Sequence, residues 1–121
     1  MNVLIVQSRL DLGQLWQRHL VRQGMQVVLA QSQDEAFAYL AVNAADIIIL
    51  DLVIEDGSAL AVADYANYRH PAARVIFVTN TSFFSDGSIF AHSANACALI
   101  PTATPPDDLA AMVEHYAAAR E

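Results

Sequence analysis

Five short runs of apolar residues are spaced along the chain, and each is too short to form a helix. The runs are VLIV at 3–6, VVLA at 27–30, IIIL at 47–50, VIFV at 75–78 and CALI at 97–100. Because successive side chains of a strand point to opposite faces, a run that is apolar at every position predicts a strand buried on both faces. The five runs therefore predict a parallel sheet with helices covering both sides.

Segments with apolar residues at helical spacing separate these runs. In the first segment Leu12, Leu15, Trp16, His19 and Leu20 share one helical face. A glycine commonly follows the last turn of a helix, so Gly24 is expected to end this one. The second helix is expected to begin at Ser32, because Ser32 and Glu35 have the spacing of a capping box.

Three further helices complete the pattern. One is expected from about Ser58 to Tyr68, before Pro71. A shorter one is expected over roughly 88–94. The last is expected from Thr104, with Pro105 in the first turn, where the missing N–H of proline is harmless. Strands that alternate with helices in this way predict one α/β domain over residues 1–121.

Composition narrows the class of protein. Hydrophobic residues make up 55% of the chain and charged residues 16%, against about 25% charged in ordinary proteins, which indicates one well-buried globular domain. No apolar run approaches the roughly 18 residues of a membrane span, so no membrane partner is expected. The single cysteine, Cys97, excludes an internal disulfide and fits a reducing cytoplasm. Cys97 is expected to be a buried apolar residue rather than a reactive thiol.

The charge pattern limits the partners. The formal net charge is -7, and all six cationic side chains are arginines. Because an acidic protein repels phosphate backbones, nucleic acid is not an expected partner. The histidines at 19, 70, 92 and 115 do not have the spacing of metal ligands.

Polar residues follow the apolar runs where a parallel sheet usually binds ligands, at the carboxyl ends of its strands. Gln7–Ser8 follow the first run, Asp51 the third and Thr79–Asn80 the fourth, and Ile100–Pro101 close the last. With the common strand order 2-1-3-4-5 these ends surround one pocket centred on Asp51. A carboxylate at the end of a buried run is costly unless it has partners, so Asp51 is the candidate functional residue.

Taken together, these segments resemble the receiver domain of two-component response regulators over nearly the whole chain. The resemblance is carried by VLIV, IIILDLVIEDGSAL at 47–60, VIFVTN at 75–80, SANACALIP at 93–101 and PPDDL at 105–109. It implies a flavodoxin-like (βα)5 fold, a three-layer sandwich with a five-stranded parallel sheet of order 2-1-3-4-5. It also implies that Asp51 is the phosphoacceptor position and Thr79 the switch hydroxyl.

The chain departs from the family pattern around Asp51, so the pocket is expected to be degenerate. The family ends its first strand with two acids that bind Mg²⁺, whereas this chain has Gln7 and Ser8. The usual lysine after the fifth strand is replaced by Ile100, although Pro101 follows as expected. A single carboxylate is a weak anchor for Mg²⁺, and a phosphoryl group would meet no designed counter-cation. No metal or other cofactor is therefore expected, and any metal ligand would be Asp51.

Two neighbours of the pocket have simpler interpretations. Ser8 is expected to cap the first helix, because Asp11 follows at capping-box spacing. Arg9 is the one cation that could reach Asp51 or a bound anion. A solvated arginine at the start of the helix is the favoured interpretation.

Two loops also allow more than one interpretation. Asp56–Gly57 is expected to be an ordinary turn rather than part of an acidic patch. Phe83 and Phe84 are expected to pack against the start of the helix at 88–94. The alternative is that they form a lid or a contact with a partner.

The sequence favours a stand-alone receiver-like signalling protein that is not an enzyme and acts by binding other proteins. Mg²⁺-dependent phosphorylation is expected to be lost or impaired, and because no effector domain follows within these residues, output is expected to pass through a separate partner. Expected partners are a histidine kinase or another signalling protein, or a second copy bound through the helix at 88–94, the last strand and the last helix.

The sequence also allows two alternative functions. In one, the chain is a working phosphoacceptor that a histidine kinase phosphorylates on Asp51, with Mg²⁺ as cofactor. In the other, the same fold is an enzyme or binds a nucleotide or flavin. The second alternative is disfavoured because residues 7–13 contain no glycine-rich phosphate loop.

Overall fold

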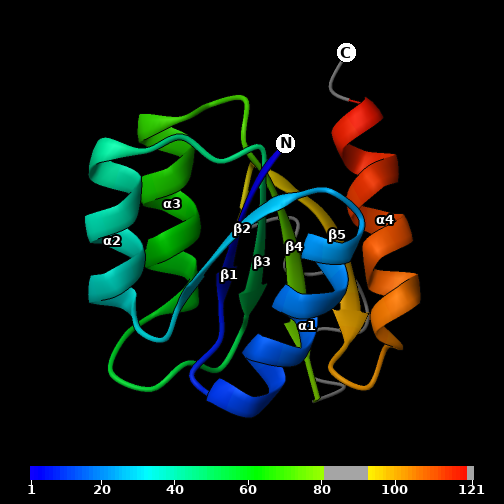
Figure 1. The fold of residues 1–121 in the computed structure, drawn as a ribbon. Coiled ribbons are helices and arrows are strands. Elements are labelled where there is room, and N and C mark those ends of the chain that lie inside the picture. The colour runs from blue at the N-terminus through cyan, green and yellow to red at the C-terminus, as the bar shows by residue number, and fades with distance from the viewer. Residues whose placement is uncertain (81–92, 120–121) are drawn as a thin grey trace.

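One parallel sheet organises the chain (Figure 1). The computed structural model describes residues 1–80 and 93–119. Within these residues five strands pair in the order β2-β1-β3-β4-β5. They are β1 Asn2–Val6, β2 Gln26–Ala30, β3 Ile47–Asp51, β4 Arg74–Thr79 and β5 Ala96–Pro101. The predicted strands, each within one residue at either end, and the predicted order are confirmed.

Helices cover both faces of this sheet, which confirms the three-layer flavodoxin-like arrangement. The helices within the described residues are α1 Leu10–Arg22, α2 Gln33–Val42, α3 Ala59–Arg69 and α4 Pro106–Ala119. Figure 1 shows α2 and α3 together on one face, and α1 and α4 on the other. The helix predicted at 88–94 falls almost wholly outside the described residues. No helix within those residues is both long and apolar enough to cross a membrane.

Each face of the sheet has its own hydrophobic core. Leu50 and Phe77 pack under α2 and α3, where Leu40 meets them. Ile49 and Ile76 point to the opposite face and pack with Trp16 of α1. Alternate residues of the central strands thus serve opposite cores, as their unbroken apolar runs predict.

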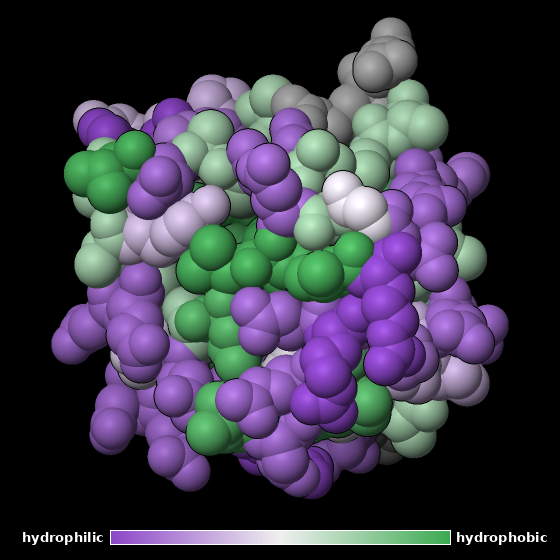
Figure 2. Space-filling view, in the orientation of Figure 1, coloured by the Kyte–Doolittle hydropathy of each residue, from purple (hydrophilic) through white to green (hydrophobic). Residues whose placement is uncertain are grey.

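Contrary to the prediction from its apolar run, the edge strand β2 is not buried on both faces. Its residues alternate between exposed and half-buried before the buried Ala30, and Val28 is 39% exposed. Figure 2 shows hydrophobic side chains at the surface over this strand. Because alternate residues lie on opposite faces, the exposed Gln26 and Val28 show that one face of this edge strand is less covered than the faces of the central strands.

The first two predicted helix ends are confirmed. Gly24 follows α1 with φ of +87°, a conformation that glycine adopts without strain. The Ser32 hydroxyl accepts the N–H of Glu35 at 3.2 Å and caps α2. At the start of α3, Ser58 caps the helix in the same way by accepting the N–H of Ala61 at 3.3 Å.

The predicted start of the last helix was wrong by two residues. Helix α4 begins at Pro106, and the first helical bond runs from the N–H of Leu109 to the carbonyl of Pro105 at 3.0 Å. Pro105 cannot take the helical conformation easily because another proline follows it. The Thr104 hydroxyl donates instead to the carbonyl of Pro101 at 2.6 Å, so it does not cap the helix.

The loop from β3 to α3 contains the predicted turn. Asp56 has φ of +53° and Gly57 φ of +156°. A Cβ atom at position 57 would lie 2.4 Å from the Cβ of Gln33, so only glycine fits against α2. The Gln33 side chain also accepts the N–H of Ser58 at 2.8 Å, which ties this loop to α2.

Strand β5 contains a β-bulge next to its start. Val75 pairs with Ala96 and Ile76 with Ala98, so Cys97 is the extra residue. The Cys97 thiol is half-buried and donates to the carbonyl of Val75 at 3.4 Å. Burial raises the pKa of this thiol above its ordinary 9.0, although the nearby Arg74 guanidinium opposes the shift. The predicted burial of Cys97 is thus confirmed only in part, and that its thiol is unreactive stays a prediction.

Cys97 should make stability fall at alkaline pH. Unfolding returns the thiol to its ordinary pKa, so in alkali the unfolded state loses the proton first. The contribution of Cys97 to the free energy of unfolding is therefore complete at a pH below the pKa of the thiol in the unfolded state. It is lost as the pH rises through the higher pKa of the thiol in the folded state. We expect the free energy of unfolding in urea to fall more steeply between about pH 8 and about pH 10 in the wild type than in Cys97→Ala. Parallel curves would contradict this expectation.

Candidate functional site

The carboxyl ends of four strands meet at one edge of the sheet. The register pairs Val6 with Leu50, Asp51 with Val78 and Thr79 with Pro101. All the predicted pocket residues therefore lie at this edge, with different exposure. The buried residues are Gln7, Asp51, Thr79 and Ile100. Ser8 is half-buried, and Asn80 and Pro101 are exposed.

Asp51 is the last residue of β3, and the residue as a whole is 9% exposed. Its Oδ2 accepts the side-chain amide Nε2–H of Gln7 at 2.7 Å, and its Oδ1 accepts the backbone N–H of Val53 at 2.9 Å. A buried carboxylate needs such donors, because an unpaired one costs several kcal/mol. Both oxygens of Asp51 are therefore held by neutral donors from this chain.

Gln7 is placed by the strand that precedes it. Its backbone N–H donates to the carbonyl of Ala30 at 3.0 Å, which extends the pairing of β1 with β2, and the residue is 1% exposed. Its side-chain Oε1 accepts the N–H of Arg9 at 3.0 Å. The reversed amide would set an oxygen against the Asp51 carboxylate, so the surrounding bonds fix its orientation.

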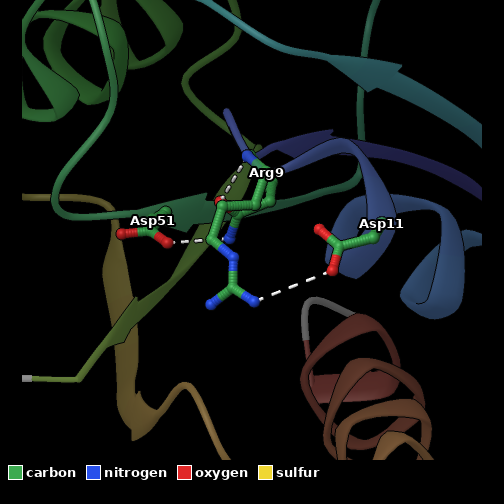
Figure 3. A network of polar contacts seen from close by, with 4 residues as sticks. Arg9, Asp11 and Asp51 are labelled. Carbon is green, nitrogen blue, oxygen red and sulfur yellow. Dashed lines mark hydrogen bonds and ion pairs between the residues drawn. The ribbon is translucent and has the colours of Figure 1, made fainter.

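Arg9 joins this network through its backbone rather than its charge. Its guanidinium lies 3.7 Å from the Asp11 carboxylate, and the two side chains are 65% and 80% exposed. Figure 3 follows these contacts from Asp51 to Arg9 and on to Asp11. Exposed ion pairs of this kind contribute little free energy. The structure thus agrees with the interpretation of Arg9 as a solvated residue beside the helix start.

The prediction that Ser8 caps α1 was wrong. Arg9 is the N-cap residue, and no side chain caps this helix. The Ser8 hydroxyl instead donates to the carbonyl of Gln31 at 2.9 Å and accepts the N–H of Glu55 at 2.8 Å. The hydroxyl thus bonds to two backbone groups distant in the sequence and not to the first turn of α1. Ser8 therefore ties the loop after β2 and the loop after β3 to the end of β1.

The other predicted residues do not add charge to the site. Ile100 is 8% exposed and packs in the core beneath α1 and α4, among residues such as Val78 and Leu109. Thr79 is 7% exposed, and its carbonyl accepts the N–H of Thr102 at 2.9 Å. Ile100, at the position where the family usually has a lysine, is thus part of the hydrophobic core.

The residues around Asp51 do not fit a Mg²⁺ ion. Mg²⁺ needs near-octahedral oxygen ligands, which usually include carboxylates. Within residues 1–80 and 93–119, no three His, Cys, Asp or Glu side chains are grouped to hold a metal ion. Gln7 presents an N–H donor, not an oxygen, to the Asp51 carboxylate. The arrangement stabilises a lone carboxylate without a cation.

Gln7→Ala should destabilise the fold, because it removes the amide donor from a buried carboxylate. We expect a loss of about 1.5–3 kcal/mol in the free energy of unfolding, the range for hydrogen bonds to charged groups. Gln17→Ala is the matched control, since Gln17 donates to the neutral carbonyl of Val27 at 3.2 Å and should cost about 1 kcal/mol. Urea unfolding at neutral pH measures both, and equal losses would mean that Asp51 does not depend on Gln7.

Comparison with known proteins adds two findings. The family described as Response regulator receiver domain matches residues 3–114. A search of curated proteins found no match.

Solved structures of low sequence identity share the fold. A CheY-like response regulator receiver domain protein from Methanospirillum hungatei JF-1 has a TM-score of 0.90 at 19% identity, covering 98% of this chain and 94% of its own. The signal receiver domain of a putative Luxo repressor protein from Vibrio parahaemolyticus has a TM-score of 0.87 at 20% identity, covering 98% and 91%. A response regulator from Burkholderia pseudomallei, with a phosphorylated aspartic acid, calcium ion and citrate, has a TM-score of 0.80 at 20% identity, covering 99% and 74%.

Proposed function

This chain belongs to the response regulator receiver domain family of two-component systems, and from that premise we propose that it signals by binding another protein, with Mg²⁺-dependent phosphorylation of Asp51 lost or impaired. Domains of this family are generally signalling modules rather than enzymes. The expected partner is a histidine kinase or another signalling protein.

One observation carries this proposal: the buried hydrogen bond of 2.7 Å from the Gln7 amide to Asp51 Oδ2. Phosphoryl transfer relies on cations that neutralise charge in the transition state and position the reacting groups. At this site a neutral amide takes the place of a metal-binding acid. An incoming phosphoryl group would have to displace the amide or compete with the Val53 N–H on Oδ1.

The charge balance supports the same conclusion. A phosphoryl group adds roughly two negative charges to the residue that carries it. The guanidinium of Arg9 is exposed and contacts Asp11, while Ile100 lies in the hydrophobic core. Among the residues that the structure describes, phosphorylated Asp51 would thus have no cation close by at the edge of the core, which is unfavourable.

The same contacts give the domain a fixed shape. Ser8 holds the loops that follow β2 and β3, and Gln7 holds the carboxylate at the end of β3. In our proposal these bonds keep the loops in one arrangement without phosphorylation, so a partner meets a constant surface. A second copy bound through the 88–94 segment, β5 and α4 stays a prediction, because most of that segment lies outside the described residues.

Incubation with acetyl phosphate and Mg²⁺ tests the loss of phosphorylation. We expect the intact mass of the wild type to stay unchanged, whereas a phosphoacceptor gains about 80 Da. Asp51→Asn is the matched control for modification elsewhere on the chain. An adduct on the wild type that Asp51→Asn lacks would establish the working phosphoacceptor and contradict our proposal.

A further inference from the structure

A hollow of about 540 Å³ lies at the end of the sheet opposite Asp51. Its lining includes the first residues of two strands, Arg74 of β4 and Ala96 of β5, with Asn67 of α3 and Ala117 of α4 beside them. Arg74 pairs with the first residue of β3, whereas Asp51 is the last residue of that strand. Four steps along a strand, about 13 Å, therefore separate the hollow from the level of Asp51.

Small apolar residues make up most of the lining. Six of its nine residues are alanine or proline, and the polar ones are Asn67, Arg74 and Asn95. The buried Asn95 amide already accepts from the Ser93 hydroxyl at 2.8 Å and donates to the Ala63 carbonyl at 3.1 Å. Arg74 is thus the charged residue of the lining, and most of its neighbours in the lining have small side chains.

The positive charge of Arg74 is not balanced by a carboxylate among the described side chains. The charged contacts within residues 1–80 and 93–119 are Arg9–Asp11 and His19–Asp107, and neither includes Arg74. The guanidinium lies 5.8 Å from the centre of the Tyr116 ring and near the Cys97 thiol. Because burial raises the pKa of that thiol, Cys97 stays neutral at neutral pH and does not neutralise Arg74.

The backbone is irregular at the same place. The β-bulge of β5 inserts Cys97 directly after Ala96, and Ala96 pairs with Val75, the residue that follows Arg74. Bulges redirect side chains, and they occur often beside functional sites. The regular pairing of the sheet is thus interrupted beside Arg74, the charged residue that lines the hollow.

From these observations we propose that the hollow binds a small anion, whose carboxylate or phosphate group contacts the Arg74 guanidinium. Guanidinium offers several N–H donors in a fixed plane and binds both groups with two parallel hydrogen bonds. The small side chains of the walls leave room for a small ligand, and because the hollow exposes more polar than apolar surface, a compact polar anion suits it. In an acidic chain, such a site selects anions by one specific contact rather than by overall attraction.

Titration of the isotope-labelled full chain with sodium acetate, and separately with inorganic phosphate, at constant ionic strength tests the site. The signals to follow are the Arg74 Nε–H group and the amides of residues 94–96. We expect saturable shifts with a dissociation constant on the order of 1 mM for at least one probe, since so few ligand atoms cannot bind much more tightly. Saturable shifts with acetate would indicate a carboxylate ligand, and saturable shifts with inorganic phosphate would indicate a phosphate ligand.

Variants decide whether Arg74 is responsible. Arg74→Met should abolish the saturable shifts, and Arg74→Lys should weaken binding by several-fold because it keeps the charge but loses the planar donors. Arg22→Met, which removes an exposed arginine at the end of α1, should bind like the wild type. Linear shifts with both probes in the wild type, or unchanged binding in Arg74→Met or Arg74→Lys, would overturn the proposal. Asp51→Asn should also bind normally, so this test is independent of the proposed function.

Discussion

The double variant Gln7→Asp/Ser8→Asp should acquire a Mg²⁺ response that the wild type lacks. Gln7→Asp removes the amide donor and sets a second carboxylate near Asp51 Oδ2, from which the Gln7 amide is now 2.7 Å away. Ser8→Asp adds a third acid at the same strand end. Without metal these carboxylates repel one another, so the variant should be less stable than the wild type.

Mg²⁺ should reverse this loss, because binding to the folded state alone stabilises it. At a free concentration one hundred times the dissociation constant, the gain is about 2.7 kcal/mol. Urea unfolding with and without Mg²⁺ measures it, and the wild type should show no change. The triple variant with Asp51→Asn should lose much of the response. A double variant that is indifferent to Mg²⁺ would mean that the site lacks more than these two acids.

Trp16→Ala should produce the largest loss of stability. Trp16 is 2% exposed and packs between α1 and the sheet, with Ile49 and Ile76 in the same core. Replacing a buried tryptophan by alanine leaves a cavity and costs about 3–5 kcal/mol, a large part of the stability of a small domain.

The control for this variant is Leu10→Ala on the same helix. Leu10 is 46% exposed, so its replacement should change stability by no more than about 0.5 kcal/mol. Both values come from urea unfolding. A loss of under about 1 kcal/mol for Trp16→Ala would indicate that α1 is not firmly docked, and that the network through Arg9 is not held in place either.

The strands were predictable because their physical cause is local in the sequence. A central strand of a parallel sheet is buried on both faces, so 3–6, 47–50 and 75–78 must be apolar at every position. The same pattern at 27–30 does not reveal that β2 is an edge strand, because strand order depends on the whole chain. The start of α4 depended on a detail of local geometry, the restriction that Pro106 places on Pro105.

The sequence placed Gln7 and Asp51 at the same edge but did not predict their hydrogen bond. These residues are 44 positions apart, and the bond depends on the side-chain geometry of both. The Val53 N–H that holds the other oxygen is a backbone group, which no residue type signals. Ser8 was assigned to a local cap because its true partners, the backbones of Gln31 and Glu55, are adjacent only in the folded protein.

The measurement that tests the central claim most directly is a Mg²⁺ titration followed by amide chemical shifts, with and without beryllofluoride as a phosphoryl mimic. If the Gln7–Asp51 bond replaces the metal site, the amides around Asp51 should not shift in a saturable way up to about tens of millimolar Mg²⁺. Saturable shifts confined to the carboxyl edge of the sheet, which Asp51→Asn abolishes, would contradict the claim and show that the site still binds metal and phosphoryl groups.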